Sequence, residues 1–250
     1  MTQQFAGKSA FVTGGGSGIG RASALALAAE GALVTVAGRT AATLEETVRL
    51  VEAAGGSARY VVGDMTDEAQ IEHAVQVATE GIGRLDLALN NAGYDGEYQL
   101  TKDYSTEMLD RMIALNIRGM FLSMKYELRH MVAQGSGAIV NMSSGAGLIG
   151  TPGFSGYSAT KAAEIAMTKS SALETAPHGI RINAVCPGLV DTPMIADLDE
   201  EQRKSISAAH PLGRIAYPGE IADAVVWLCS DKASFVTGIA LPVDGGYTVP

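Results

Sequence analysis

Short apolar runs recur along the chain, and segments in which apolar residues return every three or four positions separate them. The runs are apolar on both faces, and most are followed by Gly, Asp or Asn. Strands buried in a parallel sheet have this pattern, whereas the intervening periodicity is typical of helices. We therefore predict strands at residues 9–13, 33–37, 59–63, 85–90, 138–143, 181–186 and 239–243. The predicted helices are 20–30, 41–54, 67–80, 106–133, 158–176 and 219–229.

Strands and helices alternate over all 250 residues, with no linker, repeat or low-complexity tract between them. This alternation predicts an α/β fold, a doubly wound parallel sheet of Rossmann type with about seven strands and helices on both faces. The length suits a single domain, residues 1–250. The longest stretch without a predicted element, 188–214, has apolar residues that need cover. We predict a substrate lid there, with a plain surface loop as the alternative.

A glycine-rich segment from Thr13 to Gly20 follows the first predicted strand and leads directly into the first helix. Glycines allow a tight turn and let the backbone approach a pyrophosphate, and a helix N-terminus offers free N–H groups to it. Glycine-rich runs also form ordinary loops. The placement between a strand and a helix nevertheless favours a dinucleotide site.

The formal net charge of −9 argues against a nucleic-acid partner, which usually needs a basic surface. No apolar run reaches the roughly 18 residues of a membrane span, and the N-terminus lacks the pattern of a secretory signal. The two cysteines and four histidines are not spaced as a disulfide framework or a metal site. We expect a cytoplasmic protein without metal, membrane or nucleic-acid partners.

Tyr157 and Lys161 stand four residues apart, on one face of a predicted helix. A phenol with a pKa of about 10 is a poor base at neutral pH, and a nearby ammonium lowers that pKa. The pair can therefore exchange protons, although the same spacing also occurs in simple surface pairs. Ser143 and Ser144 end the fifth predicted strand, where a hydroxyl can hold a substrate oxygen. Asn116 lies in an apolar helix, where a buried amide needs partners.

In these features the chain resembles the short-chain dehydrogenase/reductase family, whose motif Thr-Gly-x-x-x-Gly-x-Gly matches residues 13–20. The resemblance extends from Gly7 to about Tyr247 and includes family motifs at residues 90–93 and 244–246. It implies an NAD(P)-dependent enzyme that transfers a hydride between nicotinamide C4 and the carbonyl or secondary alcohol carbon of a small molecule. Family members usually assemble as tetramers, so a homotetramer is expected.

The resemblance also implies individual roles. Tyr157 is the general acid and base, and Lys161 tunes it and binds the nicotinamide ribose. Ser144, rather than Ser143, binds the substrate oxygen. Asn116 holds a water of the proton relay. The residues implied or expected to contact the cofactor are Gly14, Ser17, Gly18, Ile19, Gly20, Arg39, Thr40, Asp64, Met65, Asn91, Ala92, Gly93, Tyr157, Lys161, Pro187, Gly188, Val190 and Thr192.

The end of the second strand bears on the choice between NADP and NAD. NAD-binding folds place an acidic residue here for the adenosine ribose, whereas this chain has Gly38, and no carboxylate follows before Glu45. Arg39 can pair with a 2′-phosphate, and Thr40 can add a hydroxyl. We predict NADP as the preferred cofactor, with NAD possible, because Ser17 stands where many NADP-binding relatives have a second basic residue.

Alternatives remain at the level of substrate and chemistry. One is a 3-oxoacyl-[acyl-carrier-protein] reductase, whose acidic carrier would dock on basic residues such as those at 111, 118, 125 and 129. Reduction of an imine or a conjugated alkene is a second. A third is a catalytically inactive nucleotide-sensing protein of the same fold. The intact tyrosine and lysine disfavour the sensor, and apolar loops favour a mid-sized hydrophobic ketone or alcohol.

Overall fold

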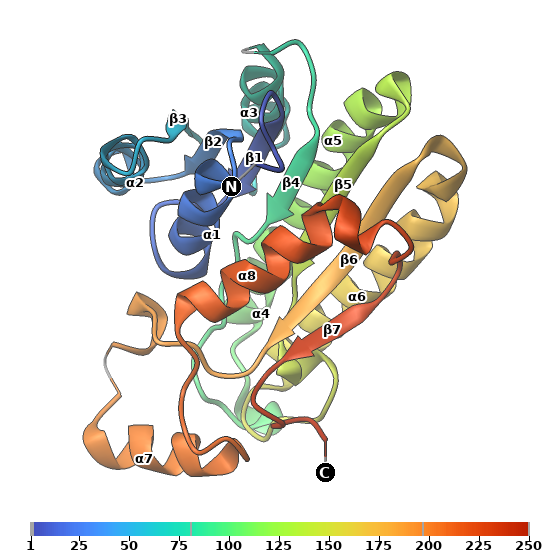
Figure 1. Cartoon of the computed structure of the whole chain (residues 1–250). Helices are drawn as coiled ribbons and strands as arrows, with labels where there is room; N and C mark the ends of the chain where they lie inside the picture. The colour runs from blue at the N-terminus through green and yellow to red at the C-terminus, as the bar shows by residue number, and fades with distance from the viewer. Residues whose placement is uncertain (1–2, 81, 197, 250) are drawn as a thin grey trace.

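The computed structural model describes residues 3–80, 82–196 and 198–249, so positions 1–2, 81, 197 and 250 of the predicted domain and lid lie outside the described residues. All seven strands pair in parallel in one sheet, in the order β3-β2-β1-β4-β5-β6-β7 (Figure 1). The strands are β1 (Ser9–Thr13), β2 (Leu33–Gly38), β3 (Ser57–Val62), β4 (Leu87–Asn90), β5 (Gly137–Met142), β6 (Ile180–Pro187) and β7 (Ala240–Val243). The predicted single-domain Rossmann-type fold is confirmed.

Helices cover both faces of the sheet (Figure 1). Side chains alternate along each strand, so Ala10 and Val12 of β1 pack on one face with α1 (Gly18–Ala29), α2 (Ala41–Ala53) and α8 (Pro218–Cys229). Phe11 packs on the opposite face with α3 (Glu68–Glu80) and α5 (Met120–Gln134). Both faces are buried, as the two-sided apolar runs predicted. None of the described helices is long and apolar enough to cross a bilayer. The longest of the described helices is α6 (Ser155–Thr175).

The predicted continuous helix at 106–133 is wrong, because a π-helical turn interrupts it. Asn116 lies in that turn and exchanges hydrogen bonds with both backbone groups of Tyr94, in the loop after β4. π-helical turns are local departures from the 3.6-residue period, often at functional sites, and an apolar pattern does not reveal them. The three segments are α4 (Thr106–Met112), the π-helix η2 (Ile113–Gly119) and α5 (Met120–Gln134).

The stretch 188–214 contains more regular structure than the sequence analysis predicted. It holds the short helix η5 (Pro193–Ile195) and the helix α7 (Glu200–Ala209), beyond the carboxyl ends of β6 and β7 (Figure 1). Helix α7 buries none of its residues, so it lacks the apolar stripe by which helices are recognised. Arg203 ties it to the preceding segment by donating to the Ile195 carbonyl at 2.9 Å and pairing with Asp191 at 3.1 Å.

Candidate active site

The chain turns sharply between β1 and α1. Gly14 and Gly18 have φ angles of +65° and +51°, in the left-handed region that residues with a Cβ rarely adopt. Gly20 faces the turn itself, because a Cβ there would overlap the Gly14 carbonyl oxygen and lie 2.7 Å from Asn91 Nδ2. That amide donates to the carbonyls of Thr13 and Gly14 at 3.2 Å each. The glycines thus let α1 begin directly against the strand ends.

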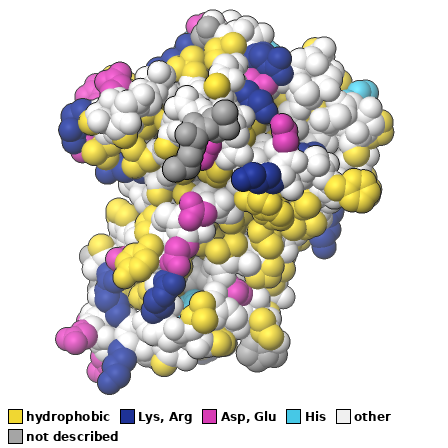
Figure 2. Space-filling model, in the orientation of Figure 1, with side chains coloured by type: hydrophobic (Ala, Val, Ile, Leu, Met, Phe, Trp, Pro, Cys, Tyr) yellow, Lys and Arg dark blue, Asp and Glu magenta, His cyan; other side chains and the backbone are white. Residues whose placement is uncertain are grey.

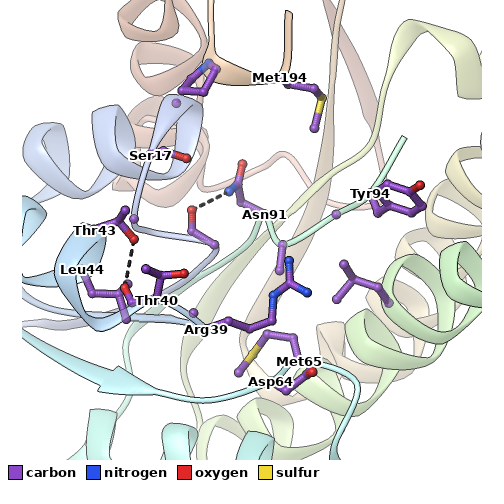
Figure 3. Close-up of a pocket in the computed structure, with 18 of the residues that line it drawn as sticks. Ser17, Arg39, Thr40, Thr43, Leu44, Asp64, Met65, Asn91, Tyr94 and Met194 are labelled. Carbon is purple, nitrogen blue, oxygen red and sulfur yellow. Dashed lines mark hydrogen bonds between the residues drawn. The ribbon is translucent and has the colours of Figure 1, made fainter. Parts of the chain in front are cut away.

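A groove of about 590 Å³ opens beside this turn, at the carboxyl edge of the sheet (Figure 3). The strand order reverses there between β1 and β4, which is where open α/β sheets bind ligands. Most of the predicted cofactor contacts line the groove: Gly14, Ser17, Gly18, Ile19, Arg39, Thr40, Asp64, Met65, Asn91, Ala92, Gly93 and Thr192.

Other predicted cofactor contacts are not walls of this groove. Gly20 packs against the turn, and Pro187 is the last residue of β6. Val190 is buried and pairs with a residue before α8. Gly188 packs against His210, because a Cβ there would lie 2.6 Å from the imidazole Nε2. The segment after β6 therefore reaches the groove at Thr192 and not earlier.

The groove also has walls that the sequence analysis did not predict as cofactor contacts. Arg111 of α4 places its guanidinium carbon 4.8 Å from the centre of the Tyr94 ring, in the loop after β4. Only the tertiary structure brings these two segments together. Thr43 had a signal, because it lies in the first turn of the helix that follows Arg39 and Thr40. The additional wall residues are Gly16, Gly38, Thr43, Leu44, Gly63, Thr66, Tyr94, Arg111, Ala114, Leu115, Pro193 and Met194.

The glycine-rich end of the groove fits a dinucleotide. The first turn of α1 contains no acidic residue, and the Ser17 side chain does not cap it. The first N–H groups of a helix have no intrahelical acceptor, and the helix dipole adds positive potential at the same place. These N–H groups could hold the pyrophosphate of a dinucleotide.

Arg39 is exposed and points into the groove (Figure 3). Within the part of the chain that the structure describes, it has neither a hydrogen-bond partner nor an ion pair. The next acidic residue, Glu45, accepts a hydrogen bond from the Tyr60 hydroxyl at 2.6 Å and is not a groove wall. Asp64 is a wall, but its Oδ1 accepts from the backbone and the hydroxyl of Thr66, at 2.9 Å each. The guanidinium is thus available to a ligand.

Tyr157 and Lys161, the pair that the sequence predicts to exchange protons, both lie on helix α6. It begins at Ser155, before the predicted start at 158, so Tyr157 lies in its first turn and Lys161 in the next. The Lys161 ammonium is 5.6 Å from the centre of the Tyr157 ring. Ser143 is buried, and its hydroxyl donates to the Lys161 carbonyl at 2.8 Å. The Ser144 hydroxyl instead accepts from the Ala146 amide at 3.1 Å, and it acts to lower the pKa of the Tyr157 phenol. Ser143 is thus occupied by the backbone of α6, whereas Ser144 is the serine that acts on the Tyr157 phenol.

Asn116 connects the π-helical turn to the other elements of the site. Its Oδ1 accepts from the Tyr94 amide at 2.9 Å, and its Nδ2 donates to the Tyr94 carbonyl at 2.8 Å and to the Thr160 hydroxyl at 3.0 Å. A Cβ at Gly93 would lie 3.5 Å from Lys161 Nζ and 3.6 Å from Asn116 Oδ1. The amide thus holds the loop after β4 beside α6, and Gly93 leaves the space between lysine and asparagine open.

The pKa of the Tyr157 phenol is raised, whereas the sequence analysis expected Lys161 to lower it. Burial is the largest cause; the positive charge of Lys161 and the hydrogen bond from Ser144 offset it only in part. Glu164, which was not among the residues predicted for the site, also raises the pKa of Tyr157 through its negative charge. Burial raises the pKa of Glu164 itself to about 7, although Lys161 acts against this. A carboxylate three residues after a functional lysine was the available signal.

Comparison with known proteins assigns the family. The sequence profile of the family described as enoyl-(acyl carrier protein) reductase matches residues 14–248. Cyclohexanol dehydrogenase of Acinetobacter sp. (strain SE19) is 43% identical over 248 residues, which cover 99% of this chain and 98% of that protein. This chain is a short-chain dehydrogenase/reductase.

Other members of the short-chain dehydrogenase/reductase family agree. Cis-4-hydroxycyclohexanecarboxylate dehydrogenase of Sinomonas cyclohexanicum is 42% identical, with 99% of each protein covered. The crystal structure of levodione reductase superposes with a TM-score of 0.94 at 38% identity, covering 98% of this chain and 99% of that one. This short-chain dehydrogenase/reductase is therefore an NAD(P)-dependent oxidoreductase that acts on CH–OH or C=O groups.

The acyl-carrier alternative rested on basic residues along one helical stretch. Arg118 and Lys125 lie 3.5 and 2.7 Å from the Glu68 carboxylate, and Arg129 lies 3.7 Å from Glu72. Acidic residues of α3 thus offset the charges of these three basic residues, which therefore do not form a free basic surface. A 3-oxoacyl-[acyl-carrier-protein] reductase FabG of Thermotoga maritima is nevertheless 38% identical, with 97% of this chain and 98% of that protein covered.

Proposed function

We propose that this enzyme interconverts a cyclic secondary alcohol and its ketone, with NADP(H) as the preferred cofactor. Arg39 is the residue that supports NADP(H) as the cofactor. Its guanidinium points into the groove and has no protein partner among the described residues (Figure 3). Two relatives named for alcohols on a cyclohexane ring support the substrate class.

The positions of Tyr157 and Lys161 on α6, and of Ser144 just after β5, support the catalytic assignment. When bound, the nicotinamide supplies or accepts the hydride at the substrate carbon. Tyr157 gives its proton to the substrate oxygen during reduction and takes it back during oxidation. Ser144 donates a hydrogen bond to the same oxygen, which stabilises the negative charge that develops there. Lys161 favours the phenolate of Tyr157 and binds the nicotinamide ribose, and Asn116 holds the relay water.

The adenosine end of the groove distinguishes the two cofactors. A planar guanidinium pairs bidentately with a phosphate, so Arg39 binds the 2′-phosphate of NADP, with the Thr40 hydroxyl beside it. Asp64 and Met65 contact the adenine. Ser17 brings no second positive charge, so the preference over NAD is modest.

The lid assignment applies to residues 188–214. Met194 lines the groove with 58% of its surface exposed, as a side chain that awaits a bound molecule would be. Ile195 is buried, and Arg203 holds α7 to this segment. An apolar side chain at the mouth of the groove suits a hydrophobic ring.

Two surfaces support the proposed homotetramer. Phe121, Leu128 and Val132 line a groove of about 570 Å³ that also reaches α6. Hydrophobic side chains gather on the face of α8 and β7 (Figure 2), near which Phe235 is fully exposed and Trp227 is 39% exposed. Exposed apolar patches of this kind mark interaction sites. Location in the cytoplasm stays a prediction from the scarcity of cysteine.

The test compares catalytic efficiency for cyclohexanone reduction with NADPH and with NADH. We expect NADPH to be preferred, and Arg39→Ala to reduce that preference about ten- to a hundredfold, the usual range for charge-assisted hydrogen bonds. Arg49→Ala is the matched control, because Arg49 lies on α2 and pairs with Glu46 away from the groove. A preference for NADH in the parent enzyme would refute the proposed cofactor. If the NADPH preference survives in Arg39→Ala, the role of Arg39 is wrong.

The substrate class needs its own comparison. The parent enzyme is assayed with cyclohexanone, a linear ketone of similar size and a 3-oxoacyl thioester. We expect the ring ketone to give the highest kcat/KM. A clear preference for the thioester would show that the substrate is an acyl thioester and not a cyclic ketone.

A further inference from the structure

Glu164 is a buried carboxyl group beside Lys161, and the reaction as described so far gives it no part. It lies three residues after Lys161 on α6, and the exposed fractions of the two side chains are 5% for the lysine and 2% for the glutamate. Its Oε1 and Oε2 are 2.9 and 3.0 Å from Lys161 Nζ. Burying a charged pair is costly, so an unused carboxylate is not expected at this place.

The hydrogen bonds of Lys161 show what Glu164 does to it. An ammonium group has three N–H donors. In this structure they face the Met142 carbonyl at 2.9 Å and the two oxygens of Glu164 at 2.9 and 3.0 Å, so a ribose hydroxyl would share a donor with Glu164 when the cofactor binds. The lysine is therefore held on the sheet side of the site by β5 and by its own helix. Both oxygens of Glu164 have Lys161 as their hydrogen-bond partner within the described residues.

Few other ionisable groups face this pair. The Tyr157 phenol lies one turn earlier on α6, and Cys186 lies on β6 with a thiol whose pKa burial raises to about 11. Asp95 lies in the loop after β4; burial raises its pKa, and the positive charge of Lys161 acts against this. Lys161 is thus the cation among these groups, and Glu164 is the carboxylate in direct contact with it.

We propose that Glu164 is a positioning residue of the active site, which fixes the Lys161 ammonium and offsets its charge. It thereby limits how strongly Lys161 stabilises the Tyr157 phenolate. This inference rests on the proposed roles of Tyr157 and Lys161. While Glu164 is a carboxylate, the pair is close to neutral and the phenol keeps its proton. When Glu164 is neutral, the full charge of the ammonium acts on Tyr157 and favours the phenolate.

The test is the pH profile of kcat/KM for cyclohexanol oxidation, which needs the phenolate and therefore rises with pH. In Glu164→Gln the rising limb should move to lower pH by at least about one unit, the usual effect of one charge at contact distance. Below the limb, oxidation should then be about tenfold faster than in the parent enzyme. Glu164→Asp keeps the charge and should show less than half of this movement. If Glu164→Gln does not fold, Glu164→Leu takes its place, and we expect the same movement of the rising limb.

Glu127→Gln is the matched control, because Glu127 is another fully buried carboxyl but is bonded to Asn90 and not to Lys161. The rising limb of the pH profile of this variant should lie within about 0.3 pH units of that of the parent enzyme. An unmoved limb in a folded Glu164→Gln or Glu164→Leu enzyme would overturn the inference, as would an equal movement in Glu127→Gln. Tyr157→Phe tests the proposed mechanism separately from the role of Glu164. If this variant stays active, the proposed mechanism itself is wrong.

Discussion

Glu127 should make the stability of this enzyme depend on pH. The residue lies on α5 with no exposed surface. Its Oε2 accepts one hydrogen bond, from Asn90 Nδ2 at 3.0 Å, and its Oε1 has no partner among the described residues. Burial raises the pKa of this carboxyl from 4.5 to about 8, and the hydrogen bond from Asn90 lowers it only in part. The folded protein therefore holds a proton that the unfolded chain releases.

The sign and size of the effect follow from that difference. Between about pH 4.5 and pH 8 the folded state binds more protons than the unfolded state, so the free energy of unfolding falls as the pH rises. The loss begins above about pH 4.5 and levels off above about pH 8. At 1.36 kcal/mol for each pKa unit, its upper limit is on the order of 5 kcal/mol.

Glu127→Gln removes the titration and keeps the shape of the neutral carboxyl group. Urea unfolding of both proteins, at one protein concentration, should show equal stability within about 1 kcal/mol at pH 5. At pH 9 the variant should be more stable by about 2 to 5 kcal/mol. Glu72→Gln is the control, since this glutamate is 56% exposed and should show no comparable pH dependence. A difference between Glu127→Gln and the parent that is the same at both pH values would refute the reasoning.

Three further substitutions test the site. Tyr157→Phe should leave cofactor binding nearly unchanged and lower kcat at least about a hundredfold, the scale of a positioned general acid; near-normal turnover would contradict the assignment. Lys161→Ala should weaken both cofactor binding, measured by fluorescence titration, and kcat, whereas a change in kcat alone would exclude the ribose contact. Gly20→Ala should abolish cofactor binding, because its Cβ overlaps the Gly14 carbonyl and crowds Asn91; unchanged affinity would show that the turn is not rigid.

Local patterns in the sequence determined the fold and the main parts of the site. The two-sided apolar runs predicted the parallel sheet, since residues 10 and 11 must pack on opposite faces of β1. The sequence also revealed the glycines at 14 and 18 and the pair of Tyr157 and Lys161. Each of these motifs is formed by residues within two helical turns of one another, so its spacing can be read directly from the sequence. The family resemblance then supplied the reaction class.

Contacts between distant segments decided the rest. Only the position of α6 beside the end of β5 showed that the Ser143 hydroxyl donates to the Lys161 carbonyl, whereas Ser144 acts on the pKa of Tyr157. The π-helical turn around Asn116 depends on the backbone of Tyr94, 22 residues away. The ion pairs that neutralise the basic helix come from α3. Glu164 stood in the sequence, but its charge matters only because the fold excludes water from it, and burial is a property of the tertiary structure.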